Sequence, residues 1–220
     1  MIIVKDIYKR YTTTKGVGDW VLKGINLVIP KNRSVGIVGG NGAGKSTLLR
    51  IMCGADYATY GSVQRLCRVS WPMGNGGVEA TMTGRQNAKF ICRAHGFEDE
   101  MDERIARIQE FADLGASFDK PVNTYSAGMR SRLQFALSLA FDFDVYVSDE
   151  VTAAGDAAFR AKAQKAFEDL VGKSSIIMVA HSDSTLKNFC DSGIFLYKGH
   201  ATWYDKLDDA LYAYKETIKV

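Results

Sequence analysis

The sequence lacks the features that would place it among nucleic-acid-binding, disulfide-rich or membrane-embedded proteins. Its formal net charge is only +3, without a dense lysine and arginine block, so we expect no nucleic-acid partner. Its four cysteines have no C-x-x-C spacing, which indicates neither a zinc site nor a disulfide framework and fits a reducing cytoplasm. No stretch approaches the roughly 20 apolar residues of a membrane-spanning helix. With only three prolines and no repeat, no obvious linker divides the 220 residues.

Apolar periodicity predicts an antiparallel pair of strands at the start of the chain and a mostly parallel sheet after it. Residues 2–11 and 21–30 alternate apolar and polar positions, as half-buried antiparallel strands do. Residues 144–150 and 174–181 are apolar runs that end in polar residues, which is typical of buried parallel strands. Residues 193–204 predict a closing hairpin with a glycine at its turn.

Helical periodicity dominates the middle of the chain. Residues 83–115 predict two polar-rich helices, a third helix begins after the segment YSAGM at 125–129, and residues 206–220 predict a terminal amphipathic helix. We therefore expect an α/β fold with a mostly parallel core sheet and an N-terminal antiparallel β subdomain. A helical subdomain would be inserted at about 83–140, within a single domain that spans residues 1–220.

The segment GGNGAGKST follows a short apolar run and opens a helical pattern, which is the context of a phosphate-binding loop. Its spacing is G-x-x-x-x-G-K-[ST], and its glycines let backbone N–H groups point at phosphate oxygens. Lys45 would reach the β- and γ-phosphates of ATP, and Ser46 would ligate Mg²⁺. A dinucleotide-binding loop is the main alternative, but it would need a third glycine where Lys45 stands. The predicted nucleotide contacts of the loop are Gly39, Gly40, Asn41, Gly42, Ala43, Gly44, Lys45, Ser46 and Thr47.

Two acidic residues end one of the predicted parallel strands. Asp149 would hold Mg²⁺, and Glu150 would orient and polarise the water that attacks the γ-phosphate. Solvated acids at a strand end are the alternative, but the phosphate loop favours a catalytic interpretation. His181 ends the next strand at the same edge of the sheet, and a surface or helix-capping histidine is its alternative.

The segment YSAGM predicts exposed backbone N–H groups at the start of a helix. Ser126, Ala127 and Gly128 are small, and the N-terminus of a helix attracts anions. A serine that only caps its helix is the ordinary alternative.

Taken in order, these motifs resemble those of the ATP-binding subunit of an ABC transporter, a P-loop NTPase. The resemblance rests on GGNGAGKST, YSAGM, SDE, AAGD and AH and covers essentially the whole chain. YSAGM takes the place of the family's signature motif. The segments SWPMG, TGRQNAKFICR and the stretch from YSAGM to AAGDAAFR resemble more closely the ATP-binding subunits of capsular-polysaccharide exporters, the KpsT type.

The resemblance implies that two copies pack head to tail and share each ATP. Ser126, Ala127 and Gly128 of one copy would contact the nucleotide held by the other copy's loop, with Ser126 and Gly128 donating hydrogen bonds. His181 would take the position of the histidine that senses the γ-phosphate. Asp156 resembles the acid that contacts the dimer partner. Tyr11 resembles the aromatic residue that stacks on adenine, although it could be an exposed tyrosine at a strand end.

This sequence also departs from the family pattern. Tyr125, Ala127 and Met129 replace the leucine, glycine and glutamine that many relatives have in the signature, and the extra methyl group of Ala127 is small enough for the site to work. A glutamine that normally touches Mg²⁺ is missing near Met73. We therefore expect the metal shell to rely on Ser46, Asp149 and water.

The function that the resemblance implies is ATP hydrolysis to ADP and phosphate at the cytoplasmic face of the bacterial inner membrane. A homodimer of peripheral subunits would bind two copies of a membrane-spanning permease through residues 71–97, for which an ordinary solvated loop is the alternative. It would drive export of a lipid-linked capsular polysaccharide, and periplasmic and outer-membrane export components would be reached through the permease.

Three alternatives stay open beside capsular export. They are export of O-antigen, export of teichoic acid, and a nucleotide-dependent scaffold with little turnover. A soluble factor acting on ribosomes or DNA is disfavoured, because the spacing between Lys45 and Ser126 leaves no room for a long coiled coil and no tandem ATPase domain is present.

Overall fold

The computed structural model describes residues 1–14, 16–73, 77–149, 156–180 and 182–218. The chain forms two compact units, and each is described separately. The first comprises Met1–Pro72, Phe143–Glu150 and Lys173–Val220, and the second comprises Met73–Asp142 and Val151–Gly172. The single-domain organisation stays a prediction.

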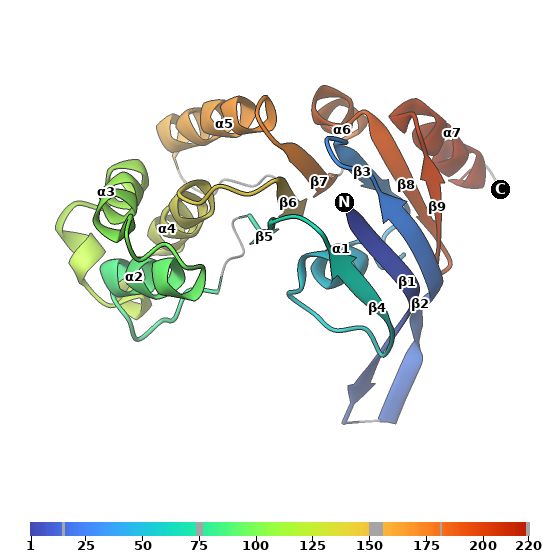
Figure 1. Ribbon diagram of the computed structural model, residues 1–220, viewed down its shortest axis with the longest axis horizontal. Coiled ribbons are helices and arrows are strands. Elements are labelled where there is room, and N and C mark those ends of the chain that lie inside the picture. The colour runs from blue at the N-terminus through green and yellow to red at the C-terminus, as the bar shows by residue number, and fades with distance from the viewer. Residues whose placement is uncertain (15, 74–76, 150–155, 181, 219–220) are drawn as a thin grey trace. The chain divides into compact units, whose positions relative to one another are not determined.

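A three-stranded antiparallel sheet opens the first unit. Strand β1 (Ile2–Thr13) lies between β2 (Gly16–Ile29) and β4 (Tyr60–Arg65) (Figure 1). The predicted alternation is confirmed in β1 and β2, whose buried side chains are aliphatic except for Lys9 of β1. Strand β4 was not predicted, because five of its six residues are exposed and its sequence has no apolar alternation.

The second sheet of this unit has six strands in the order β5-β6-β7-β3-β8-β9. All neighbouring strands are parallel except the hairpin of β8 and β9, which confirms the predicted mostly parallel core. The strand bounds are β3 (Val35–Val38), β5 (Val69–Pro72), β6 (Val145–Asp149), β7 (Ser175–Val179), β8 (Ser192–Tyr197) and β9 (His200–Tyr204). Lys198 and Gly199 both have positive φ at the hairpin turn, as a two-residue type I′ turn requires.

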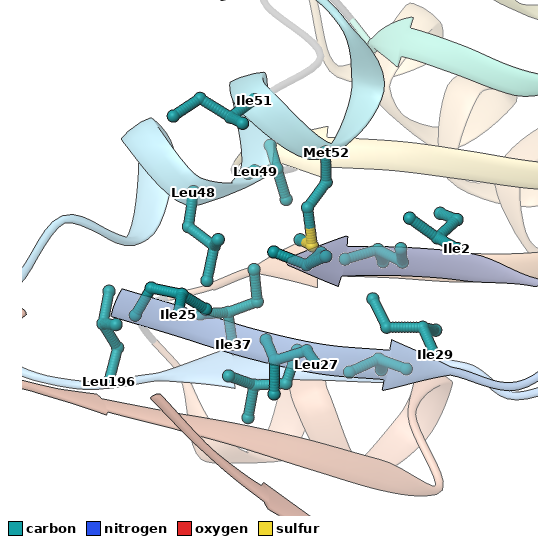
Figure 2. Packing of buried hydrophobic residues seen from close by; sticks show 14 of the residues in the cluster. Ile2, Ile25, Leu27, Ile29, Ile37, Leu48, Leu49, Ile51, Met52 and Leu196 are labelled. Carbon is teal, nitrogen blue, oxygen red and sulfur yellow. The ribbon is translucent and has the colours of Figure 1, made fainter. Parts of the chain in front are cut away.

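Helix α1 (Lys45–Cys53) shares one hydrophobic core with both sheets. Figure 2 shows Leu48, Leu49 and Met52 of this helix among aliphatic side chains of the neighbouring strands, including Ile2 and Ile37. The helix ends at Gly54, whose φ of 88° is easily adopted only by glycine. The remaining helices of this unit are α6 (Asp183–Phe189) and α7 (Leu207–Ile218).

The second unit is helical. It contains α2 (Gly84–Ala94), α3 (Met101–Ala112), α4 (Ala127–Leu139) and α5 (Ala157–Val171), with short 3₁₀ turns at Gly115–Asp119 and Val122–Thr124. Thr83 and Gln86 form a reciprocal capping box at the start of α2. The buried Arg104 guanidinium of α3 forms ion pairs with Glu100 and Asp142. Because Asp142 follows α4 in the chain, the second pair connects α3 with the residues after α4. Of the helices in the described ranges, none has both the length and the apolar character to cross a bilayer.

Two buried serines in neighbouring strands of the larger sheet differ in their hydrogen bonding. Ser70 of β5 donates to the Trp71 carbonyl over 2.8 Å and accepts from the Val147 N–H over 2.9 Å. Ser148 of β6 is equally buried, and among the described residues its hydroxyl has no hydrogen-bond partner. A buried hydroxyl without a partner lowers stability, because its bonds to water are lost and not replaced.

We therefore predict opposite effects for the same substitution at these two positions. Ser148→Ala should raise the free energy of unfolding by about 1 kcal/mol, whereas Ser70→Ala should lower it by about 1 to 2 kcal/mol, because it leaves the Val147 N–H unpaired. Urea unfolding of the purified chain measures both. A loss of stability in Ser148→Ala as large as that in Ser70→Ala would contradict the assignment.

Candidate functional site

The loop between β3 and α1 depends on two glycines. Gly39 has a φ of 156°, and a Cβ atom there would lie 2.4 Å from the Leu196 carbonyl oxygen. Gly44 precedes α1 with a φ of 101° and provides no side-chain cap for the helix. The first N–H groups of α1 therefore donate to no capping side chain, and such groups are a ready site for a phosphate.

The Lys45 side chain folds back over the loop. Its ammonium group donates to the carbonyl oxygens of Gly39 and Gly40 over 2.7 and 2.9 Å. Burial lowers the pKa of Lys45, and the nearby negative charge of Asp149 partly offsets that effect. A cation thus lies against the loop that the sequence assigns to phosphates.

Ser46 and Asp149, the two predicted metal ligands, lie together. The Ser46 hydroxyl, in the first turn of α1, donates to Asp149 Oδ1 at the end of β6 over 3.0 Å. Within the described part of the chain, no group of three or more histidine, cysteine or acidic side chains could hold a metal ion. A hydroxyl and a carboxylate fit Mg²⁺, which typically takes one or two protein oxygens and completes its shell with phosphate and water.

Tyr11 lies beside the first turn of α1. Its hydroxyl is 3.3 Å from Thr47 Oγ1 and donates to Asp56 Oδ2 over 3.0 Å, and the residue remains 38% exposed. Asp56 also binds the Lys9 ammonium group over 2.7 Å. Neither Lys9 nor Asp56 was predicted from the sequence, because no motif joins two residues so far apart in the chain.

The YSAGM segment forms the start of α4 in the second unit. Ser126 is the N-cap, and its hydroxyl accepts from the Met129 N–H over 3.2 Å, so the ordinary capping role is present. That hydroxyl keeps its own proton as a donor. Tyr125 is buried, and its hydroxyl donates to the Ser117 carbonyl over 2.6 Å, which makes it a core residue of this unit.

Asp156 lies on the same side of the second unit as the start of α4. It caps α5 by accepting from the Phe159 N–H over 2.8 Å and forms an ion pair with Arg132 of α4. The bond from Phe159 and the charge of Arg132 hold the pKa of Asp156 below its usual value. Ser126, Gly128, Arg132 and Asp156 line one pocket of about 630 Å³. The structure thus brings the predicted signature residues and Asp156 together within this unit.

Two predicted catalytic residues, Glu150 and His181, lie outside the described residues. The structure locates the last described positions before them, Asp149 at the end of β6 and Ala180 just after β7. Their roles stay predictions.

Comparison with known proteins gives a full-length match. Residues 22–153 match the family model described as ABC transporter. The chain is 44% identical to the polysialic acid transport ATP-binding protein KpsT of Escherichia coli, over 99% of this chain and all of that protein. It is 41% identical to the capsule polysaccharide export ATP-binding protein CtrD of Neisseria meningitidis, again over 99% of this chain and all of that protein. The O-antigen export system ATP-binding protein RfbB of Myxococcus xanthus is 35% identical over 90% of this chain but only 46% of its own length.

A solved structure has the same fold. The dimeric post-hydrolysis structure of the ATP-binding cassette MJ0796, bound to ADP and phosphate, aligns with a TM-score of 0.72 at 22% identity, covering 94% of this chain and 99% of that one. The predicted ABC-type P-loop NTPase fold is confirmed by this likeness. With the family match and the full-length relatives, it shows that the chain belongs to the ABC transporter family.

Proposed function

We propose that the chain is the ATP-hydrolysing subunit of an ABC transporter that exports a lipid-linked capsular polysaccharide across the bacterial inner membrane. The observation that carries this proposal is the full-length similarity to KpsT and CtrD, whose names specify polysialic acid transport and capsule polysaccharide export. The O-antigen relative is less similar and matches over less than half of its length. Export of O-antigen or teichoic acid is therefore the weaker alternative.

In the proposed site the loop binds the triphosphate. The N–H groups of residues 40–46 would surround the phosphates, and the Lys45 ammonium group would exchange its two carbonyl partners for β- and γ-phosphate oxygens. Ser46 and Asp149 would hold Mg²⁺ by the oxygens that now bind each other. When bound, the ion would neutralise charge that develops on the phosphates.

Two further residues would act on the γ-phosphate. Glu150, directly after Asp149, would accept a proton from the attacking water and orient it. His181 would contact the γ-phosphate from the neighbouring strand. Both assignments rest on the sequence motifs.

The YSAGM surface would serve the nucleotide of a second copy. Ser126 would donate its free proton to the γ-phosphate, Ala127 and Gly128 would offer the first N–H groups of α4, and the helix dipole would favour the same charge. Asp156 would contact the partner copy from the same pocket. A head-to-tail homodimer would then close over two ATP molecules.

The membrane partners would be two copies of a permease subunit, with this chain as a peripheral protein on the cytoplasmic face. Helix α2 lies within the segment predicted to dock a permease helix. Its Phe90 is 60% exposed to solvent, which supports an apolar contact with the permease there. Periplasmic and outer-membrane components would be reached through the permease.

One observation favours a nucleotide-dependent scaffold as the second candidate. The family's metal-contacting glutamine would lie near Met73, and Met73 is a buried apolar residue that offers no ligand. Fewer contacts to Mg²⁺ would slow turnover. Sustained phosphate release by the chain with its co-purified permease excludes the scaffold.

We predict that Glu150→Gln lowers steady-state ATP hydrolysis by roughly 10²- to 10⁴-fold while ATP binding is retained, because the amide cannot accept the proton of the water. Phosphate release and nucleotide binding by the complex with its permease measure the two properties. Glu110→Gln, the same change at an exposed position of α3, is the control. Hydrolysis at the wild-type rate would remove Glu150 from its assigned role.

Lys45→Ala should abolish productive ATP binding, since the loop loses its only cation among the described residues 39–47. Equilibrium binding of labelled ATP to the full chain measures the loss. If Lys45→Ala bound ATP as tightly as the wild type, the phosphate-loop assignment would be wrong.

The YSAGM proposal predicts that Ser126 variants bind ATP but do not dimerise. Ser126→Asp keeps an efficient cap for α4 and places a negative charge toward the partner's γ-phosphate, so the ATP-dependent dimer of the Glu150→Gln protein should be lost. Sedimentation with and without ATP measures the dimer, and thermal unfolding verifies the cap. A Ser126→Asp protein that dimerises with ATP would contradict the shared site.

A further inference from the structure

Asp56 joins the sheet that carries Tyr11 to the end of helix α1. One carboxylate oxygen accepts from the Tyr11 hydroxyl over 3.0 Å, and the other accepts from the Lys9 ammonium group over 2.7 Å. The Asp56 backbone N–H donates to the Arg50 carbonyl of α1 over 3.2 Å. The carboxylate is therefore fixed to the same helix that begins at the phosphate loop.

Lys9 is a buried cation in this network. Its ammonium group also donates to the Tyr57 carbonyl over 2.6 Å and lies 4.6 Å from the centroid of the Tyr11 ring. Desolvation acts to raise the pKa of Asp56, but the bonds from Lys9, the Tyr57 N–H and the Tyr11 hydroxyl outweigh it and lower that pKa. Asp56 is thus an anion at neutral pH and can bind both donors.

The Tyr11 ring is held at two points. Its hydroxyl lies between Asp56 and Thr47, and one ring face carries the Lys9 cation at the distance of a cation–π contact. Lys9 contacts a single face, and because Tyr11 is still 38% exposed, the ring keeps accessible surface for a planar group. Because Thr47 belongs to the first turn of α1, the ring is fixed relative to the phosphate loop.

We propose that Asp56 and Lys9 are positioning residues for the purine base of the nucleotide. They fix the Tyr11 ring before ATP arrives, so binding does not have to restrict the ring's rotation. This inference rests on the proposed function, in which the loop binds the phosphates and Tyr11 stacks on adenine. It adds two residues, neither of which touches the nucleotide.

The test separates the base from the phosphates. Asp56→Asn should weaken binding of Mg-ATP to the full chain by roughly three- to tenfold, which is a part of the affinity that base stacking contributes. The reason is that Lys9 loses its counter-charge and the Tyr11 hydroxyl loses its charged acceptor. Binding of inorganic tripolyphosphate, which has no base, should be unchanged. Asp19→Asn, the same change at an exposed position of β2, should alter neither affinity.

Variants of Tyr11 identify which step fails. Tyr11→Phe keeps the ring and removes the hydroxyl, so its ATP affinity should fall about as far as that of Asp56→Asn, and the double variant should show no further loss. Tyr11→Ala should show the largest loss of ATP affinity, with tripolyphosphate binding retained.

The outcomes distinguish this inference from the proposed function. If Tyr11→Ala bound ATP like the wild type, the stacking role would be wrong and positioning would fall with it. If Tyr11→Ala lost affinity for ATP while Tyr11→Phe and Asp56→Asn did not, the stacking role of Tyr11 would be supported and the positioning role of Asp56 and Lys9 would be wrong. An equal loss of ATP and tripolyphosphate binding in Asp56→Asn would assign Asp56 a purely structural role. A wild-type chain that bound neither compound would refute the phosphate loop itself.

Discussion

The burial of α1 in the core of the first unit is the constraint on which the phosphate loop depends. Leu48, Leu49 and Met52 are completely buried, so this helix cannot shift without opening a close-packed core. Its first residue is thereby fixed just beyond the end of β3, and the chain reaches it by passing Gly39 against the Leu196 carbonyl. The same placement brings Ser46 to Asp149. The arrangement of the candidate ligands is a consequence of how the helix packs.

In the second unit, two residues proposed to contact a second copy of the chain also stabilise helix termini. Ser126 caps α4 and Asp156 caps α5, so each residue combines a structural bond with a proposed contact to a second copy. Tyr125 shows how the unit accommodates a departure from the family pattern. Its hydroxyl lies where a Cβ atom at Gly84 would approach to 2.9 Å, so the larger side chain is admitted because position 84 is glycine. The tyrosine therefore alters the core of the unit, while the backbone N–H groups of the YSAGM segment remain available for the proposed contact with nucleotide.

The sequence predicted those parts of the site that are local in the chain. The phosphate loop and the start of α4 are contiguous segments whose glycines and small residues determine backbone geometry directly. Ser46 and Asp149 were predicted to share Mg²⁺ because a phosphate loop needs an acidic residue at the end of an apolar strand, and the hydrogen bond between them shows that they lie together. Lys9 and Asp56 were missed because their contact depends on how β1 packs beside the end of α1, and a lysine within an alternating strand looks exposed. Strands β4 and β5 were missed because one is polar and the other short.

Two lysines of the first unit, the buried Lys9 and the partly buried Lys45, differ in how their charge is compensated. Lys9 binds the Asp56 carboxylate, and this pairing compensates for the loss of its hydration. The ammonium group of Lys45 instead contacts two neutral carbonyl oxygens, and no carboxylate among the described residues forms an ion pair with it. Burial lowers its pKa because the charged form is incompletely compensated. A phosphate would complete the counter-charge that Asp149 supplies only in part, so the incompletely compensated cation would contribute to the affinity of the loop for nucleotide.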